Sequence, residues 1–392
     1  MNKRVAVVGG GAAGFFAAIN LKEMCPGVQV CILERSARPL AKVEISGGGR
    51  CNLTNSFASV GTDLAQVYPR GHRLLGRLFR SFSHRDAYAW FERRGVALVT
   101  QSDDCVFPAS QDARSISHLF LREARRLGIE LHTGVRISSL SDLADYDYVI
   151  VAIGGQPRRE GLLWLEQPIE EPVPSLFTLS IADERLHELM GTVVPQAQAL
   201  LPGTRLRASG PLLITHWGMS GPCILRLSSY GARLLSECGY RHPLAVNWLG
   251  MSAAEAQQMI AQIISRHPQR LLSTERPDGM QQRLWQYLLE KSLGGRAHAP
   301  WGSLNQKEQN RLLNTLTNDT YDVCGRAPHR DEFVTCGGIS LTAVNPQTLE
   351  SKTHPGLYFA GEVLDIDGVT GGFNFQAAWT TAHAVARAIA AI

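Results

Sequence analysis

Residues 5–14 are VAVVGGGAAG, and this short stretch decides the fold. Its first half is a continuous apolar run, as expected for a parallel strand that is buried on both faces. Its second half contains the pattern G-x-G-x-x-G at residues 9–14, and a helix of small residues is predicted from about 12 to 24. Residues 28–33 form another apolar run. This order predicts a right-handed βαβ unit.

Each glycine of the pattern has a physical role in binding a dinucleotide. Gly9 permits a tight turn, Gly11 lets the backbone approach a pyrophosphate, and Gly14 allows close packing of helix and strand. The helix N-terminus offers free N–H groups and a positive dipole end to phosphates. Glu34, twenty residues after Gly14, can accept hydrogen bonds from both ribose hydroxyls, and its charge disfavours NADP. The motif predicts dinucleotide binding without separating NAD from FAD.

A second glycine-rich segment, KVEISGGGRCN, follows at residues 42–52. Lys42 and Arg50 supply positive charge, and consecutive glycines expose backbone N–H groups, so the segment suits a phosphate or an electron-rich ring. The alternative is a flexible surface loop with a solvated arginine. Three glycines in a row between Ser46 and Arg50 favour the binding loop.

Two further apolar runs end in glycine. Residues 148–153 lead into Gly154 and Gly155, and residues 356–360 lead into Gly361. Because the carboxyl ends of parallel strands line the ligand crevice of an open α/β sheet, we expect these ends to meet in space. The predicted fold class is α/β, with a Rossmann-like domain.

The length of 392 residues predicts two or three domains. A proline-rich link at 168–174 is expected to be irregular. Short strand-like runs then alternate with turns, and helical periodicity follows, with capping-box patterns at Ser252/Glu255 and Ser303/Gln306. The domains expected are a nucleotide-binding domain in two parts, 1–177 and 329–392, and an inserted domain at 178–328, with a β-barrel at about 178–250 and helices at about 251–328.

Composition is that of an ordinary globular protein. The 39 Lys and Arg against 35 Asp and Glu leave a net charge of +4, too small an excess to argue for nucleic acid. The eight cysteines form no C-x-x-C pair, so we predict no metal site and a reducing compartment. An N-terminal signal peptide is the alternative for the first apolar run, but the glycine pattern explains it better. No apolar run reaches the length of a membrane span, and a cytoplasmic protein is predicted.

Several segments together resemble a known family. They are residues 42–52, THWGMSGP at 215–222, TCGG at 335–338 and GLYFAGEVLDIDGVTGGFN at 356–374. With the N-terminal glycine pattern, they are similar to the FAD-dependent flavoproteins that include aminoacetone oxidase and a dehydro-bile-acid reductase. The resemblance implies an FAD domain of the glutathione-reductase/fumarate-reductase type, interrupted by an inserted β-barrel plus helical domain. It also implies non-covalent FAD in an extended form.

The resemblance assigns roles to individual positions. Ala13 would touch the pyrophosphate, and Val135 would face the adenine through its backbone. Glu362 and Asp365 would lie near the ribityl chain and pyrophosphate. Residues 372–374 would begin the closing helix beneath the flavin, where a helix N-terminus stabilises negative charge. Together with the two glycine-rich motifs, the predicted cofactor-binding residues are Gly9, Gly11, Ala12, Ala13, Gly14, Glu34, Arg35, Lys42, Ser46, Gly47, Gly48, Arg50, Cys51, Asn52, Val135, Ala152, Gly154, Gly155, Gly361, Glu362, Asp365, Gly372, Phe373, Asn374 and Phe375.

The sequence also departs from the family pattern, which leaves the substrate open. The segment after Gly155 is shortened, Ile153 stands where threonine is usual, and residues 103–105 replace a more typical basic residue. No second G-x-G-x-x-G exists to hold a nicotinamide nucleotide in its own domain. NAD(P)H is therefore expected only as a transient electron donor.

No catalytic acid or base is assigned from the sequence. His216 is a candidate, with a structural histidine as the equal alternative, and Cys51 is interpreted as a packed residue rather than a redox thiol. A basic segment, called here the arginine strip, contains Arg70, Arg73, Arg77, Arg80, Arg85, Arg93 and Arg94. A solvated helix face is favoured over a binding surface for an acidic substrate or RNA.

The sequence favours an FAD-dependent oxidoreductase that transfers hydride between the flavin and a small organic substrate. Two alternatives stay open: a flavin-dependent tRNA-modifying protein, motivated by the arginine strip, and a flavin-binding redox sensor without turnover. The expected partner is the small-molecule substrate. Neither nucleic acid nor a membrane is expected to bind, and the oligomeric state is not predicted.

Overall fold

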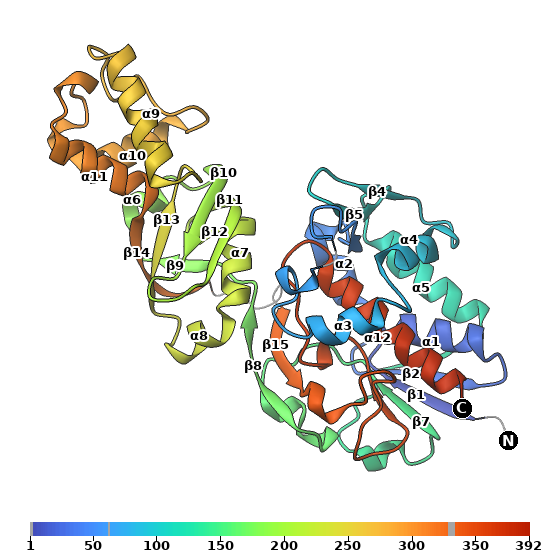
Figure 1. Ribbon diagram of the computed structural model, residues 1–392. Coiled ribbons are helices and arrows are strands. Elements are labelled where there is room, and N and C mark those ends of the chain that lie inside the picture. Colours follow the sequence, from blue (N-terminus) through green and yellow to red (C-terminus); the bar gives the residue numbers. More distant parts are fainter. Residues whose placement is uncertain (1–2, 62, 328–333) are drawn as a thin grey trace. The chain divides into compact units, whose positions relative to one another are not determined.

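The computed structural model describes residues 3–61, 63–327 and 334–392. The chain divides into two compact units (Figure 1). Unit 1 comprises Met1–Ser175 and Glu332–Ile392, and unit 2 comprises Leu176–Asp331. The limit that the sequence analysis predicts between residues 328 and 329 lies outside the described residues.

A five-stranded parallel sheet forms the centre of unit 1, in the order β16-β7-β1-β2-β6. Its strands are β1 (Arg4–Val8), β2 (Gln29–Glu34), β6 (Glu130–Thr133), β7 (Tyr148–Val151) and β16 (Leu357–Phe359). The helix α1 (Ala12–Met24) connects β1 to β2. The βαβ unit predicted from the glycine pattern is therefore confirmed.

Strands that are far apart in the sequence lie side by side in this sheet. β7 pairs with β1 on one side and with β16 on the other, all in the same direction. The loops that follow these strands consequently meet at one edge of the sheet, as predicted. The closing helix α12 (Phe373–Ala390) packs along α1, and small residues on both helices permit the close approach.

Further elements flank the sheet in unit 1. The helices are α2 (Ala41–Gly49), α3 (His72–Leu78), α4 (His84–Glu92) and α5 (Arg114–Arg126), with 3-10 turns at Leu64–Gln66, Leu140–Leu143, Arg159–Gly161, Leu163–Leu165, Leu341–Ala343 and Gly361–Val363. An antiparallel sheet contains β3 (Thr54–Asn55), β4 (Leu98–Thr100) and β5 (Cys105–Pro108). A separate ladder pairs β8 (Ile169–Ser175) with β15 (Val334–Ile339).

The proline-rich link is regular structure, so the expectation for it was wrong. Pro172 and Pro174 lie within β8, which pairs antiparallel with β15. Proline removes a backbone donor and is tolerated on strands with an unpaired edge. Because this sheet has only two strands, β8 keeps such an edge.

Unit 2 is built on a closed six-stranded barrel in the order β10-β11-β12-β9-β14-β13. The strands are β9 (Leu179–Ile181), β10 (Val193–Leu200), β11 (Arg207–Thr215), β12 (Gly218–Ser220), β13 (His242–Asn247) and β14 (Asp319–Arg326), and α6 (Glu184–His187), α7 (Gly221–Tyr230) and α8 (Ala232–Glu237) accompany them. Buried and exposed residues alternate along much of β10 and β14, as expected for strands with one face toward a core.

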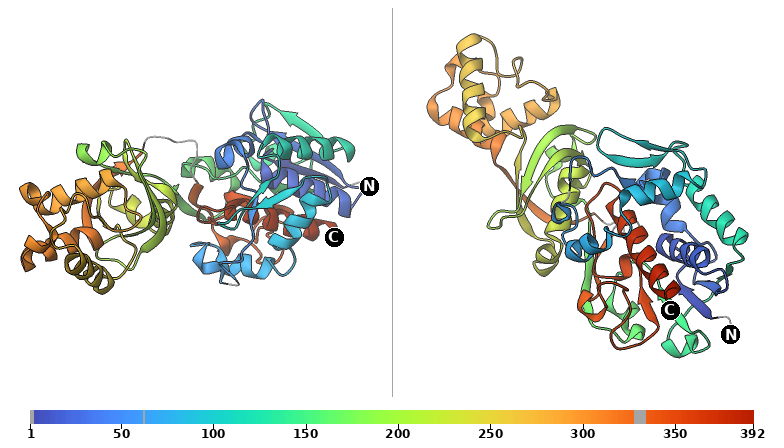
Figure 2. Two further views of the ribbon diagram at one scale, coloured as in Figure 1. Left: turned by 90° about the horizontal axis from the view of Figure 1, so that it is seen from above. Right: turned by 45° about the vertical axis from the view of Figure 1, so that its right-hand side comes forward.

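The helical part of unit 2 is an excursion from the barrel between β13 and β14. It contains α9 (Ala253–Arg266), α10 (Gln282–Leu293) and α11 (Gln306–Thr317), with 3-10 turns at Gly294–Arg296 and Trp301–Ser303. Figure 2 shows these helices gathered at one end of the barrel. Residues 319–326 were expected in the helical part, but they form β14 and close the barrel by pairing with β13 and β9.

The two predicted capping boxes had different outcomes. Ser252 and Glu255 cap α9 reciprocally, as predicted. The second prediction was wrong, because α11 begins two residues later with Asn305 as its cap and Glu308 as the reciprocal partner. Asn305 is preferred at this position because its short side chain accepts the N–H of Glu308 at 3.0 Å.

Candidate cofactor-binding site

The three glycines of the N-terminal loop are required for different reasons. Gly9 has a φ of +110°, and a Cβ there would lie 2.4 Å from the carbonyl oxygen of Ala152. A Cβ on Gly14 would lie 2.0 Å from the carbonyl oxygen of Gly9. A Cβ on Gly11, which caps α1, would meet no protein atom within 4 Å. Protein packing therefore explains Gly9 and Gly14, whereas the open space above Gly11 fits the approach of a pyrophosphate.

Glu34 is fixed at the rim of this loop. One carboxylate oxygen accepts the N–H of Gly10 at 2.7 Å. The other accepts the N–H of Ser36 at 2.8 Å and its hydroxyl at 2.7 Å. A carboxylate offers about four acceptor positions, so Glu34 retains capacity for a ribose hydroxyl while it orders the loop.

Val135 lies beside Glu34, but its backbone N–H is already bonded. It donates to the carbonyl oxygen of Glu34 at 2.9 Å. A contact between an adenine and Val135 would consequently use the carbonyl group of Val135 rather than its N–H. The neighbouring Arg35 is exposed.

The second glycine-rich segment is half helix and half loop. Lys42 lies in α2, whose helical geometry ends at Ser46, and Gly47, Gly48 and Gly49 all have positive φ angles of 57°, 68° and 81°. The N–H of Cys51 donates to the carbonyl oxygen of Ser46 at 3.0 Å, and this hydrogen bond closes the glycine loop. Three successive left-handed residues explain the glycine run, because side chains at these positions would be strained.

Two residues of this segment pack against the protein. The Arg50 guanidinium lies over the ring of Phe107, 4.4 Å from its centroid. Cys51 is fully buried, and burial raises the pKa of its thiol to about 12. A thiol that stays protonated is a poor nucleophile and a poor redox group, which agrees with the interpretation of Cys51 as a packed residue.

Glu362 joins three chain segments at the edge of the sheet. Its carboxylate accepts the backbone N–H of Thr335 at 2.9 Å and lies 3.5 Å from Nζ of Lys42. A Cβ on Gly155 would approach the same carboxylate to 2.7 Å. Gly361 has a φ of +78°, and a Cβ there would lie 2.8 Å from that of Ala13. The structure thus brings Lys42, Gly155 and Glu362 together beside the start of α1.

The N-terminus of α12 is tied to the second glycine-rich segment. With its amide oriented to satisfy its neighbours, Asn52 accepts the N–H of Gly372 at 3.1 Å and donates to the carbonyl of Thr54 at 3.0 Å. Asn374 clamps the preceding turn, accepting from the N–H of Gly368 at 2.8 Å and donating to its carbonyl at 2.9 Å. The first turn of this 18-residue helix is therefore held in place at the crevice.

The aromatic residues at this end of α12 face different surroundings. Phe373 is buried and packs edge-on against Phe57 and Tyr68, whose hydroxyl donates to the Phe373 carbonyl at 2.8 Å. Phe375 is half-buried and stacks on Trp379. These contacts explain why large rings occur here without requiring a ligand.

Sequence analysis missed a buried ion pair next to this site. Asp367 is fully buried, forms a two-pronged pair with Arg70 and accepts the Ser175 hydroxyl at 3.0 Å. Burial raises the pKa of the Asp367 carboxyl, and the Arg70 guanidinium opposes that shift. The available signal was the pair of aspartates, Asp365 and Asp367, between apolar residues at 363–369, because a buried carboxylate rarely occurs without a partner.

Two further groups of candidate residues belong to other elements of the fold. His216 is exposed in the turn between β11 and β12 of unit 2, beside Trp217. In unit 1, potential metal-ligand atoms of Cys31, Glu130 and His132 lie within 4.8 Å of one another. Burial raises the pKa of the Cys31 thiol, which disfavours the thiolate that metals bind. The expectation of no metal stays a prediction.

No helix in residues 3–61, 63–327 or 334–392 combines the length and apolar character needed to cross a bilayer.

Comparison with known proteins gives a family for both units. Residues 3–161 match the model of the HI0933-like protein Rossmann domain, and residues 173–334 match that of the HI0933-like protein barrel and H2TH domain. Together the two models cover most of the chain, in the order that the resemblance implied.

Curated relatives align over nearly the full length. A 3-dehydro-bile acid delta(4,6)-reductase from Clostridium scindens is 27% identical, with 99% of each chain covered. A ribosomal RNA dihydrouridine synthase from Escherichia coli is also 27% identical, over 97% of this chain and 96% of the relative.

The likeness to solved structures is distant. A 3-ketosteroid delta1-dehydrogenase from Sterolibacterium denitrificans has a TM-score of 0.47 at 11% identity and covers 99% of each chain. A flavocytochrome c3 fumarate reductase has a TM-score of 0.45 at 15% identity, over 100% of this chain and 78% of the other.

The match of both models, on a Rossmann unit and an inserted barrel unit that the structure shows directly, confirms the resemblance stated from the sequence: the chain belongs to the HI0933-like protein family.

Proposed function

We propose that the chain is an FAD-dependent oxidoreductase that adds hydrogen to a carbon–carbon double bond conjugated to a carbonyl group. The observation that carries the cofactor assignment is the group of loops at the carboxyl edge of the parallel sheet, which is called here the cofactor crevice. It combines an uncapped α1 N-terminus with open space above Gly11, a fixed carboxylate at Glu34, and the anchored N-terminus of α12.

The residues present fit an extended dinucleotide. Backbone N–H groups at the start of α1 would bind the pyrophosphate, and Glu34 would accept hydrogen bonds from the adenosine ribose. Lys42 and Glu362, which form an ion pair at 3.5 Å, would lie beside the middle of the cofactor. When bound, FAD supplies hydride transfer at its ring system. The N-terminus of α12 would stabilise negative charge on that ring.

The names of the relatives support the reaction type. A delta(4,6)-reductase and a dihydrouridine synthase are both named for adding hydrogen to carbon–carbon double bonds. A carbonyl group conjugated to such a bond withdraws electrons and makes the far carbon a hydride acceptor. The hydride forms one C–H bond there, and a proton completes the neighbouring carbon. We propose NADH or NADPH as the transient donor that reduces the flavin.

A uracil base in RNA is the second candidate substrate, in place of a small organic molecule. The ribosomal RNA dihydrouridine synthases among the relatives favour it. The third alternative, a flavin-binding redox sensor without turnover, has no structural observation that specifically favours it, and it is an outcome of the test below.

The test is an anaerobic absorption experiment on the purified full chain. We expect a flavin spectrum that bleaches with NADH or NADPH and returns when a 4-ene-3-oxo steroid or a uridine-containing RNA is added. A protein that binds no FAD after reconstitution would overturn the cofactor assignment. Bound flavin that no donor reduces and no acceptor reoxidises would overturn the enzymatic function and leave the redox sensor.

A further inference from the structure

Two of the seven arginines of the arginine strip in unit 1 are held in ion pairs. The Arg70 guanidinium forms an ion pair with the buried Asp367 carboxylate. Arg94 lies over the ring of Trp90, 3.8 Å from its centroid, and pairs with Glu23. Five arginines of the strip remain exposed, Arg73, Arg77, Arg80, Arg85 and Arg93, and Arg73 and Arg77 lie one helical turn apart on α3.

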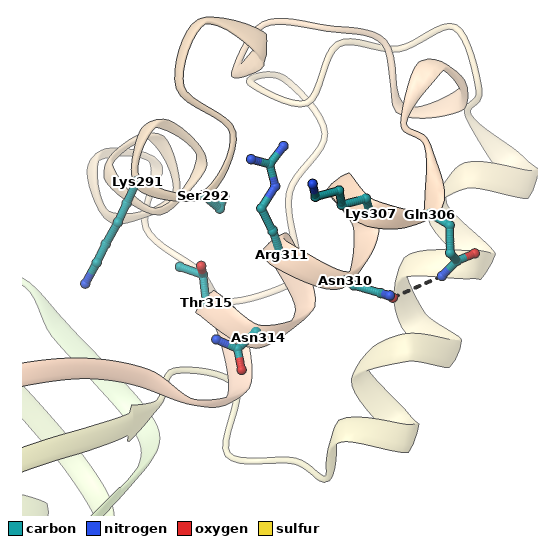
Figure 3. A pocket seen from close by; sticks show the side chains of 8 residues that line it. All are labelled: Lys291, Ser292, Gln306, Lys307, Asn310, Arg311, Asn314 and Thr315. Carbon is teal, nitrogen blue, oxygen red and sulfur yellow. Dashed lines mark hydrogen bonds between the residues drawn. The ribbon is translucent and has the colours of Figure 1, made fainter.

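A different cationic surface occurs in unit 2. An open groove of about 690 Å³ lies along α10 and α11, and we call it the α11 groove. Figure 3 shows Lys307 and Arg311 extending from α11 toward the same side, and the side chains of Gln306 and Asn310 joined by a hydrogen bond. The lining residues are Lys291, Ser292, Gln306, Lys307, Asn310, Arg311, Asn314 and Thr315.

Two cations of the α11 groove are available to a ligand. Lys291 pairs with Asp319 at 2.6 Å, so its charge is already matched. Glu308, the acidic residue of α11, is buried and pairs with Arg296. Lys307 and Arg311 are exposed, and neither forms an ion pair within 4.0 Å with any residue that the structure describes, although the charge of Arg311 helps to lower the pKa of Glu308. No carboxylate occurs among the described residues that line the groove.

The arrangement matches a sugar–phosphate chain better than a single small anion. Lys307 and Arg311 are four residues apart, a rise of about 6 Å along the helix, so each can contact a different phosphate. Asn310 and Asn314 repeat the same spacing beside them and carry both donors and acceptors, which suit 2′-hydroxyl groups. The groove is open, as an extended polymer requires.

We propose that the α11 groove binds RNA through its phosphates and 2′-hydroxyl groups. The site lies in unit 2 and uses none of the residues of the cofactor crevice. The inference goes beyond the proposed reaction and does not depend on it, because RNA can be held here whether or not it carries the reducible base.

The test measures binding of a labelled single-stranded RNA to the full-length protein by fluorescence anisotropy at several salt concentrations. We compare Lys307→Glu/Arg311→Glu with the matched pair Arg73→Glu/Arg77→Glu on α3. Removing two phosphate contacts should lower the slope of log K against log salt by about 1.4 and weaken binding about 25-fold at about 0.1 M salt. The α3 pair should leave both values unchanged.

A second comparison separates RNA from any polyanion. The wild-type protein should prefer RNA to DNA of the same sequence, and Asn310→Ala/Asn314→Ala should remove this preference without changing the salt slope. Far-ultraviolet circular dichroism and FAD content verify folding of each variant. Equal losses from the α11 and α3 pairs, no RNA binding by the wild type at low salt, or equal affinity for RNA and DNA would each overturn the assignment.

Discussion

The cofactor crevice of unit 1 and the α11 groove of unit 2 both offer positive potential to phosphates, but they are built from different atoms. In the crevice the donors are backbone N–H groups, whose positions depend on glycine geometry and buried packing. In the groove they are the ends of exposed side chains on a regular helix. Ligand binding in the crevice should therefore depend on the shape of the ligand, whereas ligand binding in the α11 groove should depend mainly on its charge.

This difference predicts how each site responds to change. Substitutions of the crevice residues that pack against protein backbone should affect folding and cofactor binding together, whereas a change at Gly11 should affect cofactor binding alone. Substitutions in the groove should leave folding intact and alter a salt-dependent interaction, because exposed side chains contribute little to stability. The predictions below test this contrast, from the largest effect to the smallest.

The largest effect should come from breaking the buried pair of Arg70 and Asp367 in unit 1. Asp367→Ala leaves the Arg70 guanidinium without its partner, and the free energy of unfolding should fall by about 4 kcal/mol. Arg311→Ala in the groove is the control and should change it by less than about 0.5 kcal/mol. Urea denaturation measures both, and equal losses would contradict the contrast between the two regions.

Two glycine substitutions sharpen the description of the crevice. Gly14→Ala places a Cβ against the carbonyl of Gly9 and should destabilise the protein by about 2 kcal/mol. Gly11→Ala meets no protein atom, so stability should stay near wild type while FAD retention falls. The pair is measured by thermal unfolding of the apoprotein and by flavin content. Wild-type FAD retention in Gly11→Ala would show that the pyrophosphate lies elsewhere.

Glu34→Gln tests the ribose contact. The amide keeps the size of the side chain but weakens its acceptance of hydrogen bonds, so FAD affinity should fall roughly tenfold. Arg35→Gln, at the exposed neighbouring position, should leave affinity unchanged. Titration of apoprotein with FAD gives the two dissociation constants. Identical values for both variants would remove Glu34 from the cofactor site.

The smallest effect concerns Cys51. Because its pKa is raised to about 12, the thiol is protonated at neutral and mildly alkaline pH, and its alkylation should stay slow between about pH 7 and 9. The exposed Cys238 and Cys324 should react under the same conditions. Mass spectrometry of iodoacetamide-treated protein identifies the modified sites. Rapid alkylation of Cys51 in folded protein would contradict its buried state.

Sequence by itself determined the core of unit 1. Continuous apolar runs followed by glycines predicted β1, α1, β2 and the meeting of β7 with β16, because buried parallel strands and tight turns limit which residues can occur. The apolar runs and the glycine turns are local requirements, and the meeting of β7 with β16 follows because the carboxyl ends of parallel strands share one edge of a sheet.

Tertiary structure decided the features that depend on partners distant in sequence. Pro172 and Pro174 are compatible with a strand only because β8 pairs with β15 alone. Residues 319–326 became a barrel strand because β13 and β9 were available on both sides. The Arg70 side chain is buried in an ion pair rather than exposed with the other arginines, because Asp367, almost three hundred residues later, provides a buried carboxylate. A local pattern specifies which conformations a segment can adopt, whereas pairing and burial against distant residues determine which charges stay exposed to bind a ligand.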